Sequence, residues 1–169
     1  MADVLIAMNP AALKVNTRHV KKGGLMILNE NAFDKDGLEK ASYASNPLED
    51  GSLRDWQVLK VPLSDLTANA LKDHPLRPNE VDRCKNFFAL GLMFWLYDRK
   101  LDHTIDWISQ KFAKKPEFVN ANIAALKAGY NHADITELMP TRFEVRQSKL
   151  APGTYRKITG NEATALGLI

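Results

Sequence analysis

The sequence predicts an α/β fold: a Rossmann-like, three-layer α/β/α domain with parallel strands, followed by a helical region. Two continuous apolar runs, 3–8 and 25–29, are typical of strands that are buried on both faces. A helical segment lies between them, and strand, helix and strand within about 30 residues indicate a right-handed βαβ unit. Beyond residue 78, long stretches with helical spacing of apolar residues predict the helical region.

Turn-forming residues bound the first unit. Asn9-Pro10 follows the first strand, and because Asn is favoured at the N-cap and Pro at the first helical position, we expect a helix from there to about Val20. Lys21-Lys22 suit the carboxyl end of a helix dipole, and Gly23-Gly24 would stop the helix before the second strand at 25–29.

The middle of the chain is polar and then returns to regular patterns. Segment 30–54 is rich in Asp, Asn, Ser and Gly and is interpreted as irregular, with turns at Pro47 and Gly51. Segment 56–62 predicts a third strand. Ser64 is expected to cap a short helix over 66–71.

Three longer helices are expected next. The first runs from Pro78 or Asn79 to about Tyr97, and its second half, 87–96, is apolar nearly all round, which predicts burial in a core or a subunit interface. Asp102 or Thr104 is expected to cap the second helix. Pro116 would begin the third, with Gly129 near its end.

The last part of the chain is interpreted as a linker, 136–158, and the start of another domain, 159–169. Pro140, Pro152 and several basic residues such as Arg146 interrupt any periodicity in the linker. Ala163, Leu166 and Ile169 then follow helical spacing. We expect the chain to be a fragment of a longer protein, the alternative being a small protein with a terminal edge strand.

Composition excludes several classes of protein. The 169 residues are 45% hydrophobic and 25% charged, which is typical of a globular domain. A net charge of +3 is too small to indicate nucleic-acid binding, and no segment has the length of a membrane span or the form of a signal peptide. One cysteine, Cys84, cannot form an internal disulfide or supply a cluster, so we expect a cytoplasmic protein.

Candidate ligand-binding residues lie where the first two strands end. Parallel α/β sheets bind ligands outside the carboxyl ends of their strands, and helix N-termini favour phosphate or carboxylate. Asn9, Asn29 and Asn31 are therefore candidate cofactor-binding residues, with Glu30 between the last two. The alternative is that Asn9 only caps its own helix and the others only satisfy a loop.

Other candidates carry less chemistry. Cys84 lies between Arg83 and Lys85, which would lower the pKa of a thiol, but a partly buried helix cysteine is the interpretation we favour. Two basic clusters, around 18–22 and 111–115, are either solvated faces or contacts for an anionic cofactor or an acidic electron carrier. The sequence contains no HExxH, GxSxG, GxxxxGK[ST] or GxGxxG motif, so no catalytic or metal-binding residue is assigned.

A family resemblance covers nearly the whole chain. ADVLIAMNPAALKVN (2–16) and GGLMILNE (23–30) resemble the gamma-type domain of 2-oxoacid:ferredoxin oxidoreductases. Further blocks are similar, in order, to the alpha subunit in which that domain precedes the pyrimidine-binding domain, the 2-oxoglutarate (KorA-like) branch being nearest. These blocks are ASYASNPLEDGSL (41–53), VPLSDLT (61–67), RCKNFFALGLMFWLYDR (83–99), TIDWISQKFAKKPEFVNANIAALKAGYN (104–131) and TGNEATALGL (159–168).

The resemblance implies the domain order and the activity. Residues 1–135 would be the C-terminal part of the gamma-type domain, 136–158 a linker and 159–169 the truncated start of the thiamine diphosphate pyrimidine-binding domain. The intact enzyme would carry out CoA-dependent oxidative decarboxylation of a 2-oxoacid, with thiamine diphosphate, magnesium, an iron–sulfur cluster and coenzyme A, and would reduce ferredoxin.

The resemblance also has gaps. The glycine-rich opening segment of the gamma-type domain and the downstream PITP-type motif are absent, and Glu162 is not to be equated with the cofactor-activating glutamate of the family. We therefore expect the chain to be inactive alone, to bind no cofactor by itself, to partner the beta subunit and to form a homodimer through 87–96 if isolated. The alternative is a free-standing small-molecule-binding or interaction module with the gamma-type fold.

Overall fold

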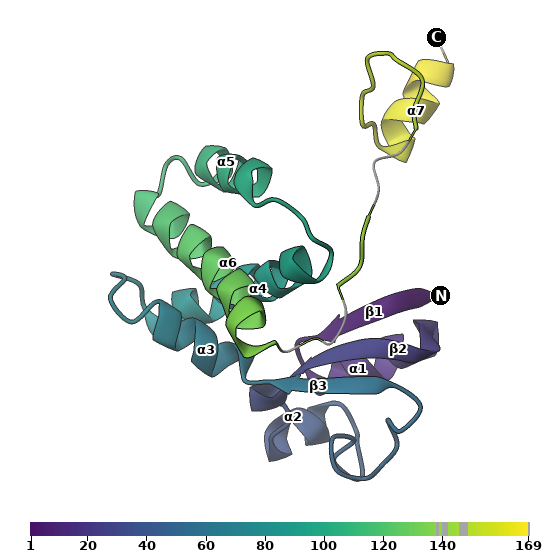
Figure 1. The fold of residues 1–169 in the computed structure, drawn as a ribbon, viewed down its shortest axis with the longest axis vertical. Coiled ribbons are helices and arrows are strands. Elements are labelled where there is room, and N and C mark those ends of the chain that lie inside the picture. Colours follow the sequence, from purple (N-terminus) through teal and green to yellow (C-terminus); the bar gives the residue numbers. More distant parts are fainter. Residues whose placement is uncertain (138, 140–141, 146–148, 169) are drawn as a thin grey trace.

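A computed structural model describes residues 1–137, 139, 142–145 and 149–168 of the protein. It confirms the predicted α/β fold with parallel strands. Strands β1 (Ala2–Ala7), β2 (Val20–Asn29) and β3 (Gln57–Val61) form a parallel sheet in the order β1-β2-β3, with helices on both sides (Figure 1).

Alternation along β2 divides the core into two layers. Met26 and Leu28 pack on one face with α1 (Pro10–Asn16) and α2 (Lys35–Lys40). Leu25 and Ile27 face the other layer, which contains α3 (Leu63–Ala70), α4 (Pro78–Leu96) and α6 (Pro116–Thr136). Because both faces of the central strand are covered, a continuous apolar run is what the fold requires there.

The predicted end of the first helix is wrong. Helix α1 ends at Asn16, a short 3-10 helix covers Thr17–His19, and residues 20–24 belong to β2. Lys21 pairs with Asp3 on one side at 2.6 Å, and Lys22 pairs with Asp55 on the other at 2.9 Å. Asp3 belongs to β1 and Asp55 lies just before β3, so contacts on both sides of β2 favour the strand over the local helical pattern.

The Gly23-Gly24 pair has a different role from the predicted helix stop. Gly23 has a φ of +75°, and its N–H donates to the carbonyl of Asp55 at 2.8 Å. The register with β1 also shifts between Ala2 and Val4. The glycines therefore form an irregularity within β2, because a left-handed backbone conformation costs glycine little.

Several helix boundaries also differ from the predictions. Helix α3 begins at Leu63, so Ser64 lies inside it, and α5 (Asp102–Lys111) begins after Leu101 with no side-chain cap. Neither Asp102 nor Thr104 serves as the predicted cap. Helix α6 continues through Gly129 to Thr136, and the short α2 lies in a segment that was expected to be irregular.

Helices α4 and α6 cross at very short range. Gly91 and Gly129 lie at the crossing, where a Cβ on Gly129 would stand 2.0 Å from the carbonyl oxygen of Phe88. The apolar segment 87–96 contains no exposed residue, but Phe87, Leu90, Met93 and Phe94 stay half-buried. The predicted core role is therefore present, and a subunit interface on this face stays a prediction.

The segment after α6 is fixed to the carboxyl end of α4. The Phe143 N–H donates to the carbonyl of Leu96 at 2.7 Å, and the Arg142 guanidinium lies 4.4 Å from the centre of the Trp95 ring. Helix α7 (Gly160–Gly167), with a capping box from Thr159, stands apart from the rest of the protein (Figure 1). Pro140, Arg146 and Ile169 lie outside the described residues, and the domain boundaries stay a prediction.

Within residues 1–137, 139, 142–145 and 149–168, the structure contains no helix that is long and apolar enough to cross a membrane.

Candidate functional site at the carboxyl edge of the sheet

Because the strands are parallel, their carboxyl ends lie at one edge, where the three candidate asparagines are found. Asn9 follows β1, Asn29 ends β2 and Asn31 lies in a 3-10 helix over Glu30–Ala32. This is the edge at which open α/β sheets bind ligands.

Asn9 caps α1 and is exposed. Its Oδ1 accepts a hydrogen bond from the N–H of Ala12 at 2.8 Å. It also lines a hollow of about 440 Å³ together with Asp34, Asp36 and Lys40. The alternative that Asn9 caps its own helix is thus observed. The residue also borders a hollow whose wall contains both acidic and basic side chains.

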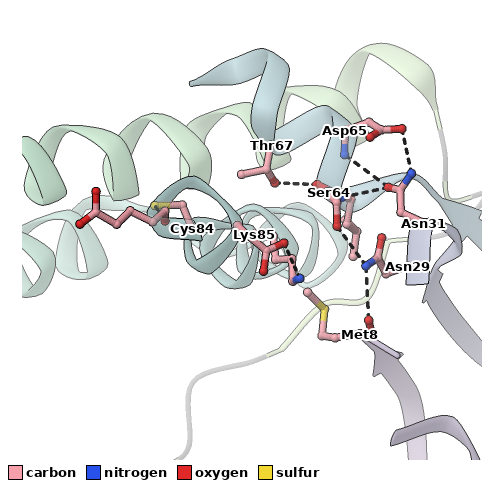
Figure 2. A network of polar contacts seen from close by, with 11 residues as sticks. Met8, Asn29, Asn31, Ser64, Asp65, Thr67, Cys84 and Lys85 are labelled. Carbon is pink, nitrogen blue, oxygen red and sulfur yellow. Dashed lines mark hydrogen bonds and ion pairs between the residues drawn. The ribbon is translucent and has the colours of Figure 1, made fainter. Parts of the chain in front are cut away.

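Asn29 is fully buried and ties the strand ends together. Its Nδ2 donates to the carbonyl of Met8 at 3.3 Å and to Oγ of Ser64 at 3.4 Å (Figure 2). Its Oδ1 is buried without a hydrogen-bond partner among the described residues. Most buried polar atoms in proteins are paired, so this oxygen is unusual in that it can still accept a hydrogen bond.

Asn31 closes the N-terminus of α3 from outside the helix. Its Oδ1 accepts from the N–H groups of Ser64 at 3.1 Å and Asp65 at 3.3 Å, and its Nδ2 donates to Oδ2 of Asp65 at 2.8 Å (Figure 2). Pro62 occupies the N-cap position and offers no side-chain acceptor. Asn31 therefore replaces the missing cap, since free N–H groups in the first helical turn need acceptors.

The asparagines do not converge on one point. Asn29 reaches Met8, next to Asn9, as expected for adjacent parallel strands. Its side chain, however, serves the α3 side of the sheet, whereas that of Asn9 serves α1. The two amides therefore lie on different sides of the sheet, and whether any of the three asparagines contacts a cofactor stays a prediction.

The polar groups at this edge of the sheet are suited to binding a ligand by hydrogen bonds. The hydrogen bonds join amides, hydroxyls, a carboxylate and backbone groups, and the amide of Asn29 has no base beside it. In the described part of the chain, no three His, Cys, Asp or Glu residues come together as a metal site would require. The described residues therefore offer no ligand set for an iron–sulfur cluster or a carboxylate-bound magnesium ion.

Cys84 is a buried helix cysteine, as the second interpretation of the sequence had it. Burial, with a contribution from Glu80, raises the pKa of its thiol to about 11, and its Sγ donates to the carbonyl of Glu80 at 3.5 Å. The flanking cations Arg83 and Lys85 do not overcome the loss of solvation. A thiol with this pKa is almost entirely protonated at neutral pH and is a poor nucleophile.

Comparison with known proteins adds to this geometry. Residues 1–132 match the family model described as pyruvate ferredoxin/flavodoxin oxidoreductase. The chain is 46% identical, over 167 residues, to the 2-oxoglutarate oxidoreductase subunit KorA of Mycobacterium tuberculosis. That alignment covers 99% of this chain and 26% of the KorA subunit, so the chain spans about a quarter of this relative's length.

A solved structure shares the fold. It is a 2-oxoglutarate:ferredoxin oxidoreductase from Magnetococcus marinus with 2-oxoglutarate, coenzyme A and succinyl-CoA bound. The TM-score is 0.56 at 20% sequence identity, over 87% of this chain and 22% of the other. At this identity the likeness concerns the fold alone.

Proposed function

The chain belongs to the pyruvate ferredoxin/flavodoxin oxidoreductase family, and from that premise we propose that it supplies the gamma-type domain of a 2-oxoglutarate:ferredoxin oxidoreductase alpha subunit. The observation that carries this proposal is 46% identity to a KorA subunit over 99% of the chain. The intact enzyme would oxidatively decarboxylate the 2-oxoacid, transfer the acyl group to coenzyme A and deliver electrons to ferredoxin.

The catalytic cofactors belong elsewhere in this proposal. The chain has a single cysteine, and its described residues offer no cluster of metal ligands. Thiamine diphosphate, magnesium and the iron–sulfur cluster are therefore assigned to the other domains and to the beta subunit. Alone, the chain would be inactive, and in the cytoplasm it would act as part of the assembly.

The carboxyl edge would face coenzyme A in the assembled enzyme. Asn9 is the exposed member of the three asparagines and lines a hollow that also contains Lys40, a cation that suits a phosphate. Asn29 and Asn31 would act behind it as positioning residues, the first through Met8 and the second through α3.

A segment exchange tests the assignment. Residues 2–168 would replace the aligned segment of the mycobacterial KorA subunit, which would be produced with its beta subunit. We expect 2-oxoglutarate- and CoA-dependent reduction of an electron acceptor by the chimera and none by the 169-residue chain alone. An inactive but correctly assembled chimera, or turnover by the isolated chain above a protein-free blank, would contradict the proposal.

The role of the edge needs a separate variant in that chimera. Asn9→Asp keeps a good N-cap acceptor but adds a negative charge where a phosphate would approach. We expect the KM for coenzyme A to rise about tenfold with the KM for 2-oxoglutarate unchanged, as loss of one charge-assisted contact would give. Asn46→Asp is the matched control, since Asn46 Oδ1 also accepts a backbone N–H, from Leu48 at 3.0 Å, in a loop away from the edge. Equal KM values for coenzyme A in the two variants would show that Asn9 has a purely structural role.

A further inference from the structure

A second hollow lies among the helices, with no strand residue in its wall. It has a volume of about 460 Å³ and is lined by residues of α4, the end of α5 and the start of α6. Small-molecule sites in proteins have volumes of several hundred cubic ångströms and combine apolar walls with a few polar groups. The residues that carry the argument are Arg83, Phe87, Phe112, Lys115, Phe118 and Asn122.

The apolar part of the wall is aromatic. Phe87 and Phe112 meet edge to face with their ring centres 6.3 Å apart, and Phe118 lies beside them in the wall. Cys84 adds a neutral thiol, because burial raises its pKa to about 11. These rings give a surface on which a flat apolar group can pack.

Asn122 places an unused amide in this wall. The residue is 4% exposed, and no hydrogen bond joins its side chain to another described residue. Its amide atoms are not among the fully enclosed unpaired polar atoms of the described residues, so they stay open to the hollow that the residue lines. A ligand in the hollow could therefore donate to or accept from this amide.

The charges around the hollow favour an anion. Arg83 and Lys115 form no ion pair with any carboxylate in the described part of the chain, whereas Arg77 is held by Glu80 at 2.7 Å. Lys115 also stands at the N-cap position of α6, so the positive end of the helix dipole points the same way. Glu80 also lines the hollow and interacts electrostatically with Lys115, whose Nζ lies 5.2 Å from the centre of the Phe118 ring. The three cations in the wall, Arg77, Arg83 and Lys115, still outnumber this one carboxylate.

We propose that this hollow is a binding site for a small organic anion with a flat apolar body. The rings of Phe87, Phe112 and Phe118 would hold the body, and Lys115, Arg83 and the Asn122 amide would hold the anionic head group. The site is separate from the carboxyl edge of the sheet and does not depend on the function proposed for that edge.

The test uses a matched pair of probes, 2-naphthoate and its neutral analogue 2-naphthamide, titrated calorimetrically into the 169-residue chain. We expect the anion to bind at least about tenfold more tightly than the amide, as a charge-assisted contact would give. Equal affinities for the two probes, or no binding of 2-naphthoate at about 1 mM, would overturn the proposal.

Variants locate the binding. Asn122→Leu removes the amide at nearly constant volume and should weaken 2-naphthoate binding about fivefold while leaving the midpoint of thermal unfolding unchanged or higher. Lys115→Gln should weaken it similarly, and Lys127→Gln, an exposed position on the same helix outside the hollow, should not. A marked loss of stability in Asn122→Leu would show that the amide is structural and overturn its assignment, and unchanged binding in Lys115→Gln would overturn the anion site.

Discussion

Replacement of Gly129 by alanine should destabilise the protein by driving α4 and α6 apart. The added Cβ would stand 2.0 Å from the carbonyl oxygen and 2.8 Å from the carbonyl carbon of Phe88. Such contacts do not occur below 3.0 Å, and both atoms belong to a helix backbone that cannot rotate away. The two helices must therefore separate locally by about 1 Å, a gap of the size that forfeits a quarter to a half of each dispersion contact.

The magnitude follows from two opposing effects. Overpacking of this kind costs about 3 kcal/mol, the upper end of the usual range, because the clash is with backbone. Alanine regains about 1 kcal/mol of helix propensity over glycine. The net loss of about 2 kcal/mol should lower the midpoint of thermal unfolding by about 4–8 °C in a chain of this size.

Thermal unfolding followed by circular dichroism measures this loss. Gly167→Ala is the control, because no atom lies within 4 Å of its added Cβ, and its unfolding midpoint should stay within about 2 °C of wild type. Gly91→Ala, whose Cβ would meet Leu126 O at 2.1 Å, should resemble Gly129→Ala. The double variant should cost less than the sum, since one separation relieves both clashes. An unchanged or raised midpoint for Gly129→Ala would refute the close crossing.

Three further predictions concern single side chains. Asn31→Ala should lower the free energy of unfolding by about 1 kcal/mol in a urea titration, because α3 loses its acceptor, and an unchanged curve would contradict that cap. Hydrogen bonds from Arg77 lower the pKa of Glu80 to about 2, so its stabilising effect is complete above pH 4.5 and is lost as pH falls toward 2. The difference in unfolding midpoint between wild type and Glu80→Gln should accordingly shrink over that interval, and a constant difference would contradict the ion pair. Cys84 should react with an aromatic disulfide reagent at pH 8 only after unfolding, and rapid reaction of the native chain would contradict its burial.

Local sequence signals predicted the carboxyl edge well. The apolar runs before Asn9 and Asn29, together with Asn-Pro at a helix start, are short-range patterns, and the structure places both residues at strand ends as they indicate. The cap that Asn31 gives to α3 was missed. Its donors, Ser64 and Asp65, lie more than 30 positions away, and the signal available in the sequence was Pro62 standing where a capping side chain would be expected.

By itself the sequence determined the parallel α/β core, because burial of β2 on both faces demands an apolar run that few other structures tolerate. It also determined the family, through blocks spread along the chain. Only the tertiary structure decided that residues 20–24 extend a strand, that Gly129 continues a helix and that Asn122 lines a hollow among helices. Each of these depends on partners distant in sequence, namely Asp3 and Asp55, Phe88, and the rings of α4 and α5. Long-range contacts outweigh local propensities, which amount to a few tenths of a kcal/mol per residue. Such contacts produce no periodic pattern in the sequence around the residues that they affect.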